Sequence, residues 1–191
     1  MAVSGDDLYQ LARICTVGLQ WNAAQAAAAA YIRSAAMPDL PAAYAVSVNA
    51  LMNLKDLRGA IDAARNMLRA VPYGAVADHS LNNLIEFLAM SVEPDALELA
   101  RARQPGLLAL LAAGAAQPPQ MGQTAGTAAL YGEGLELAFL ERYAGQEAEA
   151  AQTVAALDAA LASVAPAQVD DAAEIARARL RYGLLGGSCL R

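Results

Sequence analysis

The feature of this sequence that most constrains its fold is the regular return of proline after helix-forming stretches. Pro38, Pro72 and Pro105 lie 34 and 33 residues apart (72 − 38 and 105 − 72). Proline ends helices because it lacks a backbone N–H and its ring clashes with the preceding turn. A period of this length predicts repeated pairs of short helices, each pair burying its apolar face against the next pair.

The stretch over residues 41–72 is the clearest of these pairs. Apolar residues recur three or four apart on both sides of Asp56, which indicates two amphipathic helices. The Asp56 side chain can accept hydrogen bonds from the first free N–H groups of the second helix, so it predicts where that helix begins. Helices this short are marginal alone in water, and small residues such as Ala60 and Ala64 allow close packing between them.

The preceding unit follows the same pattern when it is compared at a distance of 34 residues. This shift aligns three pairs of residues: Asn22 with Asp56, Ala26 with Ala60, and Ala30 with Ala64. The alignment predicts helices over residues 6–19 and 23–35, with Asn22 capping the second helix. Trp21 then falls in the turn between them, where it is expected to pack against the bend.

Beyond residue 72 the pattern continues less regularly. A third pair is predicted over residues 73–105, with a second helix that starts near Pro94 and ends before Pro105. Residues 106–126 predict a short helix and then an uncharged linker rich in Gly, Gln and Pro.

The last third of the chain predicts more helices. Residues 127–164 read as a fourth hairpin, with helices over 127–143 and 147–164 separated at Gly145. Residues 168–187 read as a capping helix that closes the apolar core. The residues expected to face inward from this helix are Ile175, Leu180 and Leu184.

A helical pair of this length, with an aromatic residue early in its first helix and a closing proline, resembles the tetratricopeptide repeat. The matching residues are Tyr44, Asn49, Ala50, Leu51, Asp56, Leu57, Ala60, Ile61 and Pro72. Ser47-Val48 stands where the family usually has Leu-Gly. The resemblance implies an all-α fold, a right-handed superhelical stack of antiparallel hairpins with about nine to ten helices. It implies a single domain over residues 1–191, with repeats at 5–38, 39–72 and 73–105.

The composition excludes several classes of partner. The net charge is −6 and the pI is about 4.7, whereas a general nucleic-acid surface needs clustered Lys and Arg. The longest charge-free run, residues 14–32, is interrupted by Gln20, Asn22 and Gln25, so no membrane insertion is expected. The first residues carry neither a basic nor an apolar signal region, so a soluble, cytoplasmic protein is expected, with the compartment open if the start was trimmed.

The residue types needed for catalysis are scarce. His79 is the only histidine, and Cys15 and Cys189 form no CxxC motif, so neither a catalytic site, a metal nor a cofactor is expected. Glu133, Glu136 and Glu141 are spread around one predicted helix and are expected to be solvated. A non-enzymatic function is therefore predicted.

In the tetratricopeptide family the first helices of successive units line a concave groove, and a groove asparagine binds the peptide backbone. Compared at 34 residues, the resemblance puts two groups of three in this groove: Ala45, Asn49 and Met52, and then His79, Asn83 and Glu86. Leu11 and Cys15 take the same place in the first unit. An alternative interpretation is that Asn49 and Asn83 are ordinary solvated residues of their helices, with no role in binding.

Two functions are consistent with these patterns. The first is a protein-interaction scaffold that holds an extended peptide or a partner helix in the groove. The second rests on a weaker resemblance to helical regions that precede a thioredoxin-like domain in some bacterial proteins. In that case the chain is an accessory region of a redox protein whose catalytic domain lies elsewhere.

Overall fold

The computed structural model describes residues 5–34, 40–70, 79–114, 126–165, 169 and 171–188. Within these residues it contains nine α-helices and no strand, which confirms the all-α class. The chain divides into two compact units, residues 1–91 (unit 1) and 92–191 (unit 2), and each is described by itself. The helix-ending Pro38 and Pro72, and most of the predicted linker, lie outside the described residues.

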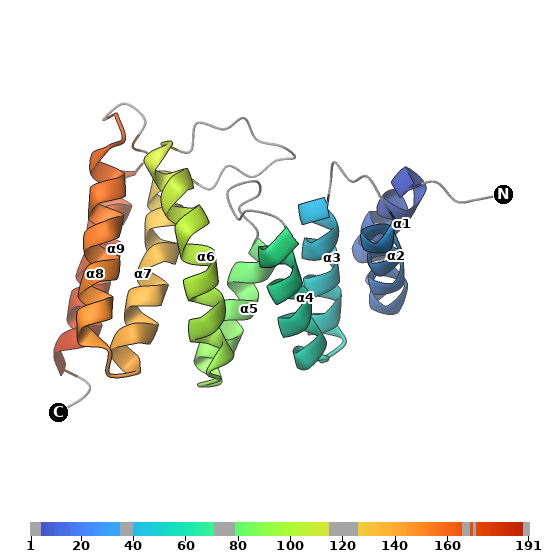
Figure 1. The fold of residues 1–191 in the computed structure, drawn as a ribbon, viewed down its shortest axis with the longest axis horizontal. Coiled ribbons are helices and arrows are strands. Elements are labelled where there is room, and N and C mark those ends of the chain that lie inside the picture. Colours follow the sequence, from blue (N-terminus) through green and yellow to red (C-terminus); the bar gives the residue numbers. More distant parts are fainter. Residues whose placement is uncertain are drawn as a thin grey trace. The chain divides into compact units, whose positions relative to one another are not determined.

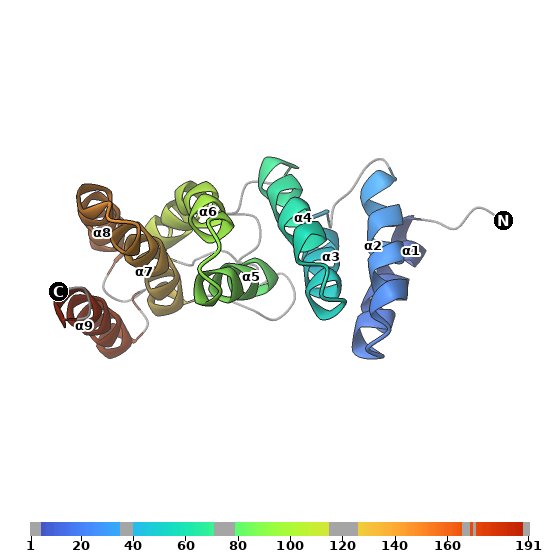
Figure 2. The ribbon, with the colours of Figure 1, turned by 90° about the horizontal axis from the view of Figure 1, so that it is seen from below.

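Unit 1 is built around α3. Its helices are α1 (Gly5–Val17), α2 (Trp21–Arg33), α3 (Leu40–Asn53), α4 (Leu57–Ala70) and α5 (His79–Met90). Three-residue turns join α1 to α2 and α3 to α4 into the two predicted hairpins (Figures 1 and 2). Helix α3 contacts both helices of the first hairpin, its own partner α4, and α5. The first helices of successive pairs therefore touch one another in turn.

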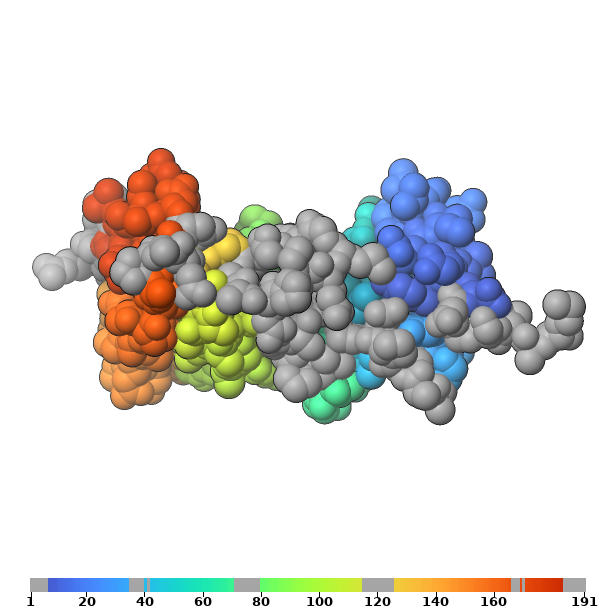
Figure 3. All heavy atoms as spheres, turned by 90° about the horizontal axis from the view of Figure 1, so that it is seen from above, coloured from blue at the N-terminus to red at the C-terminus, as the bar shows by residue number. Residues whose placement is uncertain are grey.

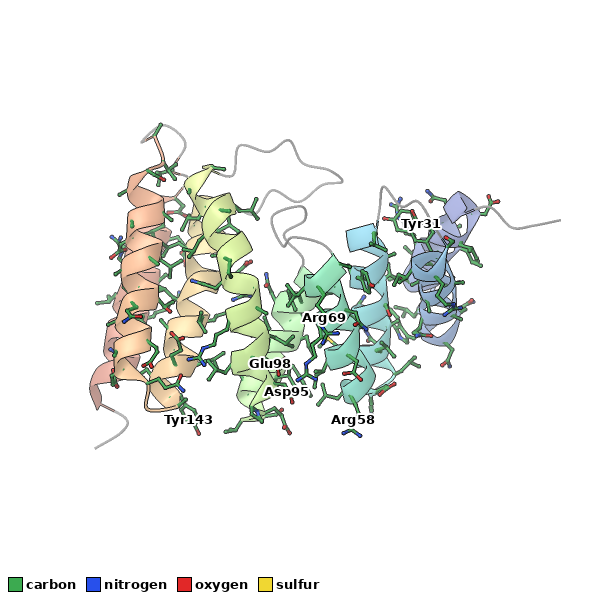
Figure 4. The ribbon with its side chains drawn as sticks, in the orientation of Figure 1. Tyr31, Arg58, Arg69, Asp95, Glu98 and Tyr143 are labelled. Atoms are coloured by element: carbon green, nitrogen blue, oxygen red, sulfur yellow. The ribbon has the colours of Figure 1, made fainter. Side chains whose placement is uncertain are left out.

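Small residues make the interface between the two hairpins close. Two buried clusters cross it: Tyr9, Tyr31 and Ala43; and Cys15, Ala24 and Ala50. A third cluster, Ala12, Ala27 and Ala28, lies within the first hairpin and packs against the partly buried Val46 of α3. Figure 3 shows α1 and α2, in blue, as one closely packed body. The Tyr9 and Tyr31 rings stack with centroids 5.4 Å apart, and Tyr31 lies near the C-terminal end of α2 (Figure 4). Alanine lets the backbones approach while the tyrosines fill the wider end.

The two hairpin turns of unit 1 have the same backbone geometry. Leu19 (φ 55°) and Lys55 (φ 61°) both take the left-handed conformation. The next amide then donates to a carbonyl five residues back, from Gln20 to Cys15 over 2.8 Å and from Asp56 to Leu51 over 3.0 Å. This is the Schellman arrangement, which satisfies carbonyls left free at a helix end. The equivalent turn residues lie 36 apart (55 − 19).

This spacing corrects part of the correspondence predicted between the two hairpins. Helix α2 begins at Trp21, not Ala23, and its capping position is Gln20, whose side chain makes no capping bond, so the predicted Asn22 cap is wrong. The buried alanines that correspond are also 36 apart, Ala24 with Ala60 and Ala28 with Ala64, in place of Ala26 and Ala30. The prediction failed because proline spacing includes connections of unequal length, whereas the turn fixes the register. Trp21 packs beside Cys15 and Ala24, as expected.

The cap predicted at Asp56 is confirmed. The Gly59 amide donates to Asp56 Oδ1 over 3.0 Å at the start of α4. Residues three and four apart then bury one side of α4, namely Ala60, Ile61, Ala64 and Met67. The opposite side carries the exposed Arg58 and Arg69, which Figure 4 shows extending from α4.

Unit 2 is built around α7. Its helices are α6 (Asp95–Ala112), α7 (Thr127–Tyr143), α8 (Glu147–Ala162) and α9 (Ala172–Ser188), and α7 contacts the other three. Figure 1 shows α6, α7 and α8 side by side, with α9 behind α8 in this view. The fourth predicted hairpin is α7 with α8, and Gly145 (φ 77°) separates them as expected. Five residues that recur at helical spacing along α7 are buried: Leu130, Gly134, Leu137, Ala138 and Glu141.

Two details of unit 2 differ from the sequence prediction. Helix α6 continues through Pro105 to Ala112 and does not end before the proline. Pro105 is exposed, and the fully buried Leu107 and Leu111 hold the second half of α6 in the core. In α9, Ile175 is buried as predicted, but Leu180 is 62% exposed. The neighbouring Arg179 faces α7 and α8 instead, because it finds polar partners there.

The helices of the described residues are either too short or too polar to cross a membrane. None of them is both long enough and apolar enough to span a bilayer. The longest, α6, has 18 residues and contains four charged side chains in its first half: Asp95, Glu98, Arg101 and Arg103.

Candidate functional site

The accessible side of α3 carries the first three predicted groove residues. Ala45, Asn49 and Met52 lie four and three residues apart and are all half-buried, so they form one stripe along the helix. The residues between them face the core. Ser47, Val48, Ala50 and Leu51 are buried.

A local hydrogen bond fixes the amide of Asn49. Asn53 Nδ2 donates to the Asn49 carbonyl over 2.8 Å and to Asn49 Oδ1 over 3.0 Å. Because the side-chain oxygen of Asn49 faces Asn53, its Nδ2 group is directed away and can donate to another acceptor. The arrangement suits contact with a carbonyl group such as that of a peptide backbone.

Helix α5 presents a second accessible stripe. Asn83 and Glu86 are both exposed, and α5 contacts α3. His79 is the first residue of α5, but its side chain lies outside the described residues. Phe87 and Met90, 44% and 77% exposed, extend this stripe with apolar surface. Neither was predicted as a site residue, although the apolar spacing on α5 already placed Phe87 and Met90 one turn apart.

The burial pattern supports the correspondence between the two stripes. The buried α3 residues have counterparts 34 positions later that are also buried: Leu81, Asn82, Leu84 and Ile85. Asn49 and Asn83 occupy the accessible position within this pattern. Helix α5 then continues to Met90, one turn past the equivalent of the end of α3. In the first hairpin only Leu11 of the expected pair is exposed. The prediction for Cys15 is wrong because the turns align it, at 36 residues, with Leu51, and both side chains are buried.

Unit 2 contains a polar cluster that was not predicted from the sequence. Glu141 is only 4% exposed, which corrects the expectation that it is solvated. It accepts hydrogen bonds from Arg101 Nε and Nη2 over 3.2 and 3.1 Å, and from Thr153 Oγ1 over 2.7 Å. Three donors and one opposite charge compensate the burial of this carboxylate.

Arg103 forms a second polar contact between α6 and α7. Its side chain is fully buried, and Nη2 donates to the Glu133 carbonyl over 2.6 Å and to Glu136 Oε2 over 3.2 Å. Glu136 is therefore an ion-pair partner of Arg103. From the sequence, a solvated residue is expected at this position. The sequence shows that the α6 segment carries arginines and the α7 segment carries glutamates. Only the packing of the two helices shows which pairs meet.

The site residues do not include a metal-binding group within the described part of the chain. No three His, Cys, Asp or Glu side chains there gather closely enough to hold an ion. The described cysteine, Cys15, is a buried free thiol. Comparison of the chain with protein-family models, with curated proteins and with solved structures gives no match in any of the three.

Proposed function

We propose that the chain is a non-enzymatic interaction scaffold and that unit 1 binds an extended peptide or a partner helix. In this proposal each unit is a segment of a right-handed superhelical stack of tetratricopeptide type. The first helices of unit 1, α1, α3 and α5, line its concave side. The peptide contacts the stripes of Ala45, Asn49 and Met52 on α3 and of His79, Asn83 and Glu86 on α5.

The observation that carries the proposal is the packing of α3. Contacts run from α1 to α3 and from α3 to α5, so the first helix of each pair adjoins the first helix of the next. This order supports a surface built from first helices, with α2 and α4 packed outside it. The buried residues 34 apart support one common orientation of α3 and α5.

The chemistry of the two stripes favours a peptide over a charged ligand. Asn49 offers a directed Nδ2 donor, and Asn83 offers both a donor and an acceptor, which suits the amides of an extended backbone. Met52 and Phe87 add adaptable apolar contact for side chains. Glu86 adds a negative charge, which favours a basic residue in the peptide.

The test is the affinity of peptides selected by phage display on the immobilised full chain. We expect the Asn49→Ala/Asn83→Ala double variant to bind a selected fluorescent peptide about tenfold or more weakly, as anisotropy measures it. The matched control is Asn66→Ala, because Asn66 is exposed on α4 and its side-chain oxygen accepts a hydrogen bond from Arg69 of the same helix. Undiminished affinity in a double variant with unchanged helix content rejects the proposal.

A further inference from the structure

An open polar pocket in unit 2 lies outside the surface proposed for peptide binding. It has a volume of about 480 Å³ and lies between α6, α7 and α8. That volume is in the range of small-molecule sites, roughly 300–1,000 Å³. The lining residues are Arg101, Gln104, Glu141, Glu149, Gln152, Thr153 and Ala156.

Two of the charged groups in the pocket already neutralise each other. Arg101 and Glu141 form an ion pair of 3.1 Å, and Thr153 occupies the second carboxylate oxygen of Glu141. Arg101 Nη2 also donates to Gln146 Oε1. This network joins α6, α7 and α8, so it serves as a fixed wall of the pocket.

Gln104 is the group in the pocket whose hydrogen bonds are incomplete. Its side chain is 8% exposed, and neither Oε1 nor Nε2 has a hydrogen-bond partner among the residues that the structure describes. A buried amide in this state is costly, so a polar partner is expected. Both polar atoms are closed to solvent, so a molecule in the pocket that Gln104 lines meets the amide only after the side chain rotates about its outer torsions.

The partner that satisfies a carboxamide at both atoms is another amide. Its carbonyl accepts from Nε2 and its N–H donates to Oε1, a pairing that neither a carboxylate nor an ammonium group provides alone. A hydroxyl or a single water satisfies one atom at a time in this geometry. Gln104 therefore favours an amide-bearing ligand.

The charge of the pocket favours a cation on the same ligand. One cation, Arg101, and two carboxylates, Glu141 and Glu149, line it, which leaves one negative charge. Glu149 is exposed on α8, one turn before Thr153, and makes no ion pair within the described residues. An ammonium group of a ligand placed near Glu149 is attracted by this uncompensated negative charge.

We infer that the pocket binds a small cationic amide, with its amide paired to Gln104 and its ammonium group beside Glu149. A free amino-acid amide supplies this chemistry, because its primary amide carries an N–H on the same side as its carbonyl oxygen. The trans peptide bond that follows the N-terminal residue of a peptide holds these two groups on opposite sides and cannot pair with both Gln104 atoms. The inference does not depend on the function proposed for unit 1.

The probes are glycinamide, glycylglycinamide and their N-acetylated forms, added to the full chain labelled with ¹⁵N. Ligands this small bind weakly, so titration extends to about 20 mM. We expect the unblocked probes to shift the Gln104 side-chain amide signals and the acetylated probes to bind at least about threefold more weakly. Glycinamide should bind more tightly than glycylglycinamide, whose primary amide lies one residue further from its ammonium group, and tighter binding of glycylglycinamide contradicts the assigned pairing.

Variants make the inference falsifiable even if the binding is weak. Gln104→Leu, followed through the backbone amide signals of the lining residues Gln152 and Thr153, should show no saturable shifts, and its urea midpoint should rise because it lacks an amide without partners. Glu149→Gln should weaken the unblocked probes alone. The control is Gln10→Leu, an exposed position on α1. The inference is wrong if no probe shifts the Gln104 signals, if acetylated probes bind equally well, or if Gln104→Leu binds as the parent chain does.

Discussion

One missing side chain sets how closely α7 approaches α8. Gly134 is buried, and a Cβ placed on it would overlap Leu157 Cδ2 and lie 3.2 Å from Leu107 Cδ2. Gly134→Ala should therefore lower the free energy of unfolding by about 1–3 kcal/mol, through overpacking of a filled core. Urea unfolding followed by circular dichroism measures this loss.

Gly132 provides the matched control in the same helix. A Cβ placed there meets no atom within 4 Å, so Gly132→Ala should raise stability by about 0.5–1 kcal/mol through helix propensity. If the loss of stability in Gly134→Ala is caused by the clash with Leu157, shortening Leu157 to alanine should relieve it. The double variant Gly134→Ala/Leu157→Ala should then lose less free energy of unfolding than the sum of the two single variants. Equal stability of Gly132→Ala and Gly134→Ala contradicts this description of the core.

The left-handed turn residues of unit 1 carry side chains where glycine is preferred. Lys55 has φ 61° and is exposed, so its side chain gains little from packing. Lys55→Gly should raise the free energy of unfolding by about 1 kcal/mol, since it relieves an unfavourable backbone conformation. Gly145→Ala, at φ 77° in the corresponding turn of unit 2, should lower it by a similar amount. Thermal or urea unfolding measures both variants. If Lys55→Gly and Gly145→Ala change the free energy of unfolding in the same direction, the assignment of these positions as left-handed turn residues is wrong.

Helix α6 contains an interior proline that its packing tolerates. Pro105 cannot donate the hydrogen bond that an ordinary residue would give to the Arg101 carbonyl, and it is exposed. Pro105→Ala should raise the free energy of unfolding by about 1–3 kcal/mol, because it restores that bond without changing the core. A lower urea midpoint in the variant would mean that α6 needs the proline to position Leu107 and Leu111.

The closing helix α9 is attached to unit 2 by a polar contact at its centre. Tyr131 of α7 is fully buried, and its hydroxyl donates to Asp158 Oδ1 of α8 over 2.6 Å. Arg179 of α9 donates to the Tyr131 hydroxyl over 2.8 Å, pairs with Asp158 and lies over the Tyr131 ring. Three helices meet at these side chains, so the contact explains why Arg179, whose side chain is 48% exposed, is directed towards α7 and α8 while Leu180 is not.

This contact predicts a loss of stability in alkaline solution. Burial, and then the hydrogen bond to Asp158, raise the pKa of Tyr131 above its ordinary 10.0. Above pH 10 the unfolded chain loses the Tyr131 proton while the folded protein keeps it, so stability falls as the pH rises towards the folded pKa. Below pH 10 the protonated Tyr131 makes its full contribution to the free energy of unfolding.

Tyr131→Phe isolates this effect. The variant should be less stable than the parent near pH 8, because two hydrogen bonds are lost, but the difference should narrow between pH 10 and pH 11. Tyr182, whose pKa burial also raises, is present in both proteins and cancels. Urea unfolding at successive pH values gives the comparison. A difference that stays constant or widens over this range contradicts the assigned role of Tyr131.

Across the whole chain, the features that depend on neighbouring residues could be predicted from the sequence. Apolar periodicity and turn residues gave α7 its observed bounds, Thr127–Tyr143, and Asp56 its role as a cap. Both depend on residues within one or two helical turns. The accessible positions of Asn49 and Asn83 follow from the same periodicity, while their role in binding stays a prediction.

Features that depend on distant partners could not be predicted in this way. Glu141 is buried because Arg101, 40 positions earlier, and Thr153 on the next helix supply its hydrogen bonds. The orientation of α9 depends on Asp158 and Tyr131 in the same manner. Charged residues are usually exposed, and the sequence alone does not show which of them are paired. The pocket beside Gln104 was not predicted because its lining residues come from α6, α7 and α8, and the sequence does not show that these residues lie together.

The most direct test of the proposed peptide surface places a photo-crosslinking amino acid on the intact chain. With p-benzoylphenylalanine at Met52 or at Glu86, a peptide selected by phage display should be captured on illumination. With the same group at the exposed Asn66 of α4, capture should be at background. Equal capture from all three positions, or capture from position 66 alone, would contradict binding along α3 and α5.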